Sequence, residues 1–209
     1  MAAAVPAPGA FCLREVLDAF RRCVTEQREV LLEPYLSGWR GLIRFLQSLG
    51  AVFSFISKDA VAKVTLLEDL CEQHGFVSVQ AMVQRELAAG RAALRSRPDS
   101  GCRTLLRLHR ALRWLQLFLQ GLLSPDSRPS VLCTDAYNAS LAEHHPWLIR
   151  KAATVAFCAL PSRDAFLEVM NVGSPQEAVA MLGEAIPYIS EVYGITQQLF
   201  EQHDLLDLP

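Results

Sequence analysis

Hydrophobic positions recur every three to four residues along most of the chain, which is the spacing of amphipathic and buried α-helices. The first such stretch, residues 11–32, has charged residues between its apolar positions and is expected to end near Pro34. The next stretch, residues 35–55, has too broad an apolar face for a helix with one side in water. Both stretches therefore predict helices, the second of them largely buried.

Turn signals divide the rest of the chain into further helices. Ser57 can cap a helix over residues 58–74, and residues rich in proline, glycine, serine and aspartate predict turns at 97–101 and 124–129. Helical stretches also lie at residues 77–93, 102–123, 132–143, 146–160, 162–169 and 174–204. The last stretch is expected to be interrupted at Pro187 and Gly194. Since no window alternates every two residues, as half-buried strands do, the sequence predicts an all-α protein of about eight helices.

The composition limits what such a protein does. Hydrophobic residues make up 51% of the 209 residues and the mean hydropathy is +0.20, yet no apolar run approaches the roughly 18 residues of a membrane span. This apolar surplus predicts a large core, an internal apolar cavity, or a surface that contacts a membrane or a partner. With 20 basic and 22 acidic residues, the net charge of -2 argues against a general nucleic-acid-binding protein.

The cysteines and the N-terminus indicate a cytosolic protein of one domain. Six cysteines lie singly, without a Cys-x-x-Cys pair or a histidine at metal-ligand spacing, so we expect free thiols, no metal site and no cofactor. Residues 1–10 are rich in alanine and proline and lack the basic residues and apolar run of a signal peptide. We expect them to form a flexible N-terminus before a single domain at residues 11–209.

Charged side chains within otherwise apolar helices are the most informative positions. Asp59 and Lys63 lie four residues apart and share a helix face, Arg103 and Arg107 repeat this spacing, and Arg110 follows three residues later. A charge that is buried without a partner costs roughly several kcal/mol, so ionised groups on core-facing helices must be paired or bind a ligand. Two interpretations stay open: a solvated basic helix face, or an oxyanion site that holds a phosphate monoester.

Enzyme signatures are missing from the sequence. It contains no Gly-x-Ser-x-Gly elbow, no glycine-rich phosphate loop and no His-Glu-x-x-His motif. The adjacent His144 and His145 would point in different directions on a helix. His145 and Trp147 flank Pro146 at a predicted helix start, where a lone histidine is more often a cap or a surface residue. We therefore expect a binding protein with no catalytic residue.

Several separated segments match one protein family in order. The segments are Phe53–Lys63, Gly101–Leu112, Tyr137–Leu141, His145–Trp147 and Leu205–Pro209. They resemble the glycolipid transfer protein superfamily, in its branch that binds ceramide-1-phosphate, and the resemblance extends over about residues 11–209. It implies a two-layer helical sandwich in which the lipid chains occupy a hydrophobic pocket and the headgroup lies at a surface site.

The resemblance also implies roles for individual residues. Asp59 would accept hydrogen bonds from the ceramide amide and the sphingoid hydroxyl, and His145 would donate to the acyl carbonyl. The side chains expected to hold the phosphate are Lys63, Arg103 and Arg107, with support from Arg110. The glycolipid-binding branch has a tryptophan at the position of Arg107 and an asparagine at that of Lys63. The two cations here therefore favour phosphate over sugar.

Apolar residues complete the site that the resemblance implies. Trp147, with Arg150 and Lys151 close behind it, would dock the protein on a membrane face, while the alternative is that Trp147 anchors the core. The residues expected to line the lipid-chain pocket are Phe45, Phe53, Phe55, Trp114, Phe118, Val155 and Phe157. The same residues would also suit an ordinary core.

The implied function is non-vesicular transfer of ceramide-1-phosphate between membranes. We expect a cytosolic monomer, peripherally associated with the cytosolic faces of the Golgi, plasma membrane or endosomes. Pocket and bilayer bury lipid chains about equally well, at roughly 0.8 kcal/mol per CH₂, so selection must come from the headgroup. Two alternatives stay open: a lipid sensor without net transfer, and a helical module whose basic residues bind an acidic partner protein.

Overall fold

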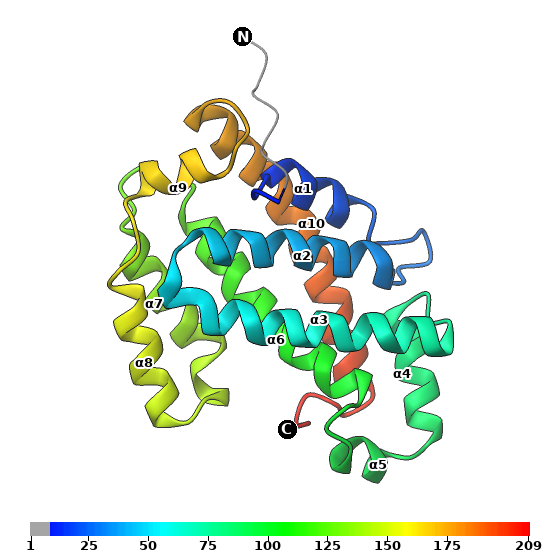
Figure 1. Ribbon diagram of the computed structural model, residues 1–209. Coiled ribbons are helices and arrows are strands. Elements are labelled where there is room, and N and C mark those ends of the chain that lie inside the picture. The colour runs from blue at the N-terminus through cyan, green and yellow to red at the C-terminus, as the bar shows by residue number, and fades with distance from the viewer. Residues whose placement is uncertain (1–8) are drawn as a thin grey trace.

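The structure is a computed structural model that describes residues 9–209, and it consists of helices joined by short connections (Figure 1). The helices of the described residues are α1 (Leu13–Arg21), α2 (Leu32–Ser48), η1 (Ala51–Phe53), α3 (Ser54–His74), α4 (Val79–Ala88), α5 (Arg91–Ser96), α6 (Gly101–Gly121), α7 (Pro129–Ser140), η2 (Ala142–His144), α8 (Trp147–Phe157), α9 (Arg163–Val169) and α10 (Pro175–Gln202). The all-α prediction is confirmed, but the described residues form ten α-helices where about eight were predicted. Of the predicted flexible N-terminus, residues 1–8 lie outside the described residues.

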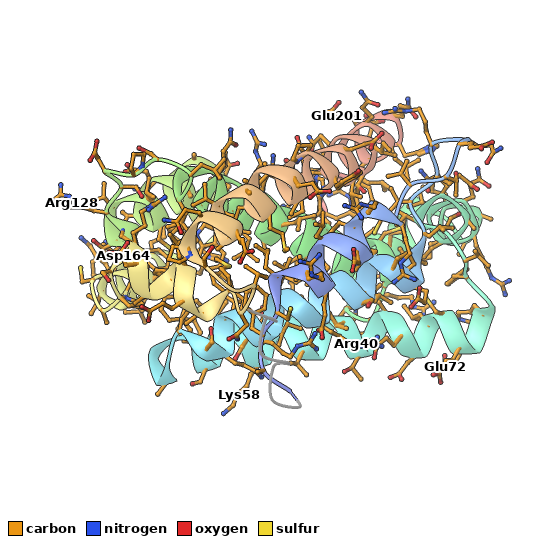
Figure 2. All side chains as sticks on the ribbon, turned by 90° about the horizontal axis from the view of Figure 1, so that it is seen from above. Arg40, Lys58, Glu72, Arg128, Asp164 and Glu201 are labelled. Carbon is orange, nitrogen blue, oxygen red and sulfur yellow. The ribbon has the colours of Figure 1, made fainter. Side chains whose placement is uncertain are left out.

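Five helices enclose the core. α1 packs on α2, α2 on α3, α3 on α6, α6 on α10, and α10 on α1. Seen from above, α2 and α3 lie along one side of the molecule and α6 and α10 along the other, with side chains filling the space between these layers (Figure 2). Among the described residues, none of the helices combines the length and the apolar composition needed to cross a bilayer.

The first helix is shorter than predicted. α1 ends at Arg21, and residues 22–31 form a turn that an antiparallel bridge between Val24 and Val30 closes. Arg28 in this turn has a φ of 59°, in the left-handed region that a right-handed helix excludes. The prediction of one helix over residues 11–32 was wrong because apolar residues kept helical spacing through a segment whose backbone reverses.

The start of α3 also differs from the prediction. The helix begins at Ser54, four residues before Lys58, and Ser57 lies inside it, with its hydroxyl donating to the Ser54 carbonyl at 3.0 Å. Ser57 is therefore not a cap. Gly50, with a φ of 99°, separates α2 from the 3₁₀ turn that leads into α3. A glycine tolerates this conformation without strain, so α2 ends here.

α10 is one continuous helix, so the predicted interruptions at Pro187 and Gly194 were wrong. Pro187 removes one backbone donor from the helix interior, a loss that usually kinks or ends a helix. Buried residues on both sides of it, Ile186 and Ile189, hold the helix in the core. α10 packs along both α1 and α6, and this burial outweighs the lost hydrogen bond.

α4 fixes the start of α6, the helix that carries Arg103, Arg107 and Arg110. Ser100 is the N-cap of α6 and accepts a hydrogen bond from the Arg103 amide at 3.3 Å. The Glu86 carboxylate of α4 accepts hydrogen bonds from the amides of Gly101 (2.6 Å) and Cys102 (2.9 Å) and from the Ser100 hydroxyl (2.8 Å). These contacts satisfy donors that a helix start leaves unpaired, and they fix the position of the arginines that follow.

Candidate functional site

A cavity of about 460 Å³ lies between α3, α6 and the start of α8, and it brings together most of the predicted headgroup residues. Asp59 and Lys63 reach it from α3, Arg107 and Arg110 from α6, and His145 from the residue pair before α8. The other residues that line it are Phe55, Ile56, Ala111, Trp114, Leu141, His144, Ile149 and Pro209. Charged side chains thus share one cavity with mostly apolar walls.

Arg103 lies beside this cavity rather than in it. It lines a smaller cavity of about 130 Å³, which Lys63 and Arg107 also line. Its Nε donates to the Pro209 carbonyl oxygen at 3.4 Å and its Nη1 donates to the Arg95 carbonyl at 3.1 Å. Because a guanidinium has five N–H donors, these two contacts leave donors for a ligand. The five predicted headgroup residues are therefore neighbours.

Positive charge is in excess at these two cavities. Asp59 and Lys63 form an ion pair across one turn of α3, in which the Lys63 side chain is 14% exposed and the Asp59 side chain 69%. Arg107 is exposed and has no hydrogen-bond or ion-pair partner among the described residues. With Arg103 and Arg110, four cationic side chains and one carboxylate side chain, that of Asp59, line the two cavities. A phosphate monoester, with about -1.5 to -2 charges, would offset most of this excess.

Arg110 differs from Arg107 because it already has partners. It is half-buried, and its Nη2 donates to the carbonyls of Leu206 at 2.7 Å and Leu208 at 3.3 Å. Burial lowers the pKa of Arg110, and the nearby charge of Arg107 lowers it further. Arg110 therefore lines the cavity while holding the segment after α10 in place.

His145 is oriented by a tyrosine that the sequence analysis did not select. Its Nδ1 lies 2.7 Å from the Tyr137 hydroxyl oxygen. Burial lowers the pKa of His145, and the neighbouring His144 lowers it further, so the ring is neutral at pH 7. When the phenol donates to Nδ1, the ring proton is on Nε2, which is then free to donate. Tyr137 and His145 lie eight residues apart on different elements, so their spacing gives no signal of this contact.

The aromatic residues predicted for the pocket lie at different depths. Phe55 and Trp114 line the cavity itself. Behind them, the Phe157 ring centroid lies 5.8 Å from that of Trp114 and 6.2 Å from that of Phe53. We call Phe53, Trp114 and Phe157 the aromatic seam. These three buried rings form a row that begins at Trp114 in the cavity wall and continues into the core.

The other predicted pocket residues lie deeper or on the surface. Phe45 and Phe118 both pack against Phe166, at centroid distances of 5.9 and 5.4 Å. Val155 is 73% exposed on α8 and does not line the cavity of 460 Å³. The structure therefore does not place Val155 with the other residues predicted for the pocket.

The first turns of α8 present an exposed apolar surface. Trp147 is 64% exposed, and Leu148 and Ile149 beside it are also exposed. This exposure shows that the alternative of Trp147 as a core anchor was wrong. Arg150 and Lys151 follow on the same helix and are exposed as well. A large apolar surface with adjacent cations is typical of a site that contacts a membrane or a partner.

The fold and the cavity define an all-α protein that presents a cluster of cationic side chains at the edge of an apolar core. Residues 30–172 match the family described as glycolipid transfer protein (GLTP). Over 207 residues the chain is 60% identical to ceramide-1-phosphate transfer protein of Bos taurus and 56% identical to that of Homo sapiens, covering 95% of this chain and 97% of each relative. The chain belongs to the glycolipid transfer protein family.

Solved structures agree with this assignment. The crystal structure of mouse ceramide-1-phosphate transfer protein in its apo form matches with a TM-score of 0.90 and 55% identity, covering 95% of this chain and 100% of that chain. The human protein in complex with 12:0 ceramide-1-phosphate matches with a TM-score of 0.88 and 55% identity, covering 96% and 100%. The predicted fold is confirmed, and the family is one of lipid transfer proteins rather than enzymes.

Proposed function

We propose that this chain transfers ceramide-1-phosphate between membranes without vesicles, as a cytosolic monomer that binds membrane faces peripherally. The observation that carries the proposal is that Asp59, Lys63, Arg107 and His145, from three separate segments, line one cavity with mostly apolar walls. The identity to relatives named ceramide-1-phosphate transfer protein supports the choice of lipid.

The headgroup roles follow from the chemistry of each side chain. Arg107 and Lys63 hold the phosphate, and Arg103 adds donors from the adjacent cavity. Asp59 accepts from the amide and hydroxyl of the ceramide, and His145 donates to its acyl carbonyl. Each charge-assisted hydrogen bond contributes about 1.5–3 kcal/mol, whereas a neutral headgroup leaves the cations unmatched. The headgroup therefore decides which lipid is carried.

The lipid chains need more room than the cavity offers. Its 460 Å³ lies within the roughly 300–1,000 Å³ of pockets for drug-sized ligands, too little for a headgroup and two long chains. The chains enter along the aromatic seam as Phe157 moves away from Phe53 and Trp114. α8, which carries Phe157, packs chiefly on α7, so its displacement disturbs few other helix contacts (Figure 1).

The exposed surface of α8 docks the protein on the membrane. Trp147 and Leu148 enter the interface, where tryptophan is favoured, and Arg150 and Lys151 contact anionic headgroups. Ile149 belongs to both this surface and the cavity wall. Docking therefore brings the cavity to the bilayer surface, at the cytosolic faces of the Golgi, plasma membrane or endosomes.

A transfer assay between vesicles tests the proposal. Donor vesicles contain ceramide-1-phosphate or a glucosylceramide with the same chains, and the rate of appearance in acceptor vesicles is measured. We expect at least about tenfold faster transfer of the phosphorylated lipid, since the neutral headgroup forfeits one or more charge-assisted bonds. Equal or reversed rates contradict the phosphate assignment. Binding of ceramide-1-phosphate without net transfer would instead indicate a sensor.

A further inference from the structure

The segment after α10 crosses the headgroup site. We call residues 205–209 the strap. Leu205 and Leu208 are buried in the core, which anchors the backbone on both sides of Asp207. Pro209 lines the cavity together with Lys63 and Arg107. Figure 1 shows this end of the chain close to α5 and α6.

Two arginines of α6 hold the strap through its backbone carbonyls. Arg110 donates to Leu206 and Leu208 at 2.7 and 3.3 Å, and Arg103 donates to Pro209 at 3.4 Å. A guanidinium that binds two carbonyls at once fixes the position of both. The strap is therefore part of the cavity wall, at the side where Arg107 presents a guanidinium that has no partner within residues 9–209.

A third arginine ties the strap from outside the cavity. Asp207 forms an ion pair with Arg95 of α5, and both side chains are exposed. The backbone carbonyl of Arg95 in turn accepts a hydrogen bond from Arg103 at 3.1 Å. This pair lines neither of the two cavities that the cations share. Its charge can thus be altered without touching a side chain of the headgroup site.

We propose, on the basis of the function proposed above, that the strap limits the size of the headgroup. It admits a phosphate monoester and excludes a phosphodiester such as phosphocholine, because a substituent on the phosphate would collide with the wall at Pro209. Steric exclusion supplies the repulsive part of specificity, which the cations alone do not, since they attract both kinds of phosphate. Arg110 is then a positioning residue that acts through the strap rather than on the phosphate.

Asp207→Asn tests this proposal with the least disturbance. Transfer of ceramide-1-phosphate and of ceramide phosphocholine with the same chains is measured between vesicles. We expect the rate for the phosphodiester to rise about threefold, because an exposed ion pair stabilises a segment only modestly. The charge swap Arg95→Asp with Asp207→Arg should restore the wild-type rate. Asp126→Asn, beyond the far end of α6, serves as the matched control.

Arg110→Leu releases the strap more completely. We expect transfer of ceramide phosphocholine to rise about tenfold or more in absolute rate, since two bonds to a charged donor are lost. The absolute rate of phosphodiester transfer is the quantity compared. Loss of a cation by itself would weaken the binding of either phosphate headgroup, so only a released strap would raise this rate. Hydrogen exchange at the amides of Leu205 and Leu208, which donate to Phe200 and Leu205, reports whether the strap is released.

The possible results distinguish a failure of the strap proposal from a failure of the proposed transfer function. If the wild type does not prefer ceramide-1-phosphate over glucosylceramide, the proposed function fails. If it does, but phosphodiester transfer stays at the wild-type rate in Asp207→Asn while exchange shows a released strap, the strap does not select headgroups. Loss of ceramide-1-phosphate transfer in Arg110→Leu with no gain for the phosphodiester would make Arg110 a direct phosphate ligand. Should Arg110→Leu fail to fold, Asp207→Asn decides.

Discussion

The hydroxyl oxygen of Tyr137 lies 2.7 Å from Nδ1 of His145. This contact orients a ring that lines the cavity between α3, α6 and the start of α8. Tyr137→Phe should therefore slow ceramide-1-phosphate transfer about two- to tenfold, the value of one neutral hydrogen bond, with little change in stability. Vesicle transfer measures the rate. The control is Tyr193→Phe, which removes a phenol hydroxyl that donates to Gln197 and should transfer the lipid at the wild-type rate. Equal rates for the wild type, Tyr137→Phe and Tyr193→Phe would contradict the role of Tyr137.

Glu86 stabilises the start of α6, and its replacement should lower stability. Its carboxylate accepts from two backbone amides and one hydroxyl. Glu86→Gln converts one acceptor into a donor that faces another donor, so we expect a loss of about 2 kcal/mol in the free energy of unfolding. For a chain of this size that corresponds to a Tm lower by about 4–8 °C. Glu72→Gln, at an exposed position of α3, should leave the Tm unchanged. Equal Tm values for the two variants would show that Glu86 does not stabilise the start of α6.

How much of this arrangement the sequence could predict depends on the range of the interaction. α6 was placed almost correctly because its apolar period and the turn residues at 97–101 are local signals. The early end of α1 and the turn at residues 22–31 were missed because they depend on the pairing of Val24 with Val30, which no period reveals. In α10, packing against α1 and α6 outweighed the local signals of Pro187 and Gly194.

The residues of the candidate site also fall into those that the sequence could predict and those that it could not. Asp59 with Lys63, and Arg103 with Arg107, lie four residues apart on helices, so their shared faces could be read from the sequence. The contacts of Tyr137 with His145 and of Arg110 with residues 206 and 208 could not, because they join elements that only the folded chain brings together. Exposure was likewise unpredictable for Val155, whose apolar side chain faces outward on α8.

His109 should make stability depend on pH. Its imidazole is buried between α6 and α10, and this burial is the main reason that its pKa is lowered to about 4. The hydrogen bond with Gln197 raises the pKa, while the nearby charges of Arg110 and Arg113 lower it further. In the unfolded chain the pKa is about 6.5, so the unfolded state takes up the proton first as pH falls. Stability is then full above about pH 6.5 and declines by about 3 kcal/mol toward pH 4.

Urea unfolding of the wild type and of His109→Leu at several pH values between 7 and 4 measures this effect. The variant should lose less stability over that range, by up to the same 3 kcal/mol. His74→Gln, at an exposed position, should follow the wild type. Parallel pH profiles for wild type and His109→Leu would show that the buried imidazole does not account for the decline.

Trp147 should determine how tightly the protein binds membranes. Trp147→Ala removes a large exposed aromatic side chain from the first turn of α8, and we expect vesicle binding to weaken about tenfold or more. Co-sedimentation with vesicles that contain anionic lipid measures the binding. Val77→Ala, an exposed apolar residue before α4, is the control. Binding that weakens equally in both variants would indicate a nonspecific effect of surface hydrophobicity.

Replacing Arg107 tests whether this cavity holds the phosphate, because its guanidinium has no partner among the described residues and lines the cavity beside Lys63. Transfer of ceramide-1-phosphate and of the matched glucosylceramide is compared for wild type, Arg107→Leu, and the control Arg113→Leu, whose arginine lies over the Tyr193 ring at 5.3 Å. We expect the preference of Arg107→Leu for the phosphorylated lipid to fall about tenfold or more while its Tm is unchanged. An undiminished preference in Arg107→Leu would contradict the assignment of this cavity as the phosphate site.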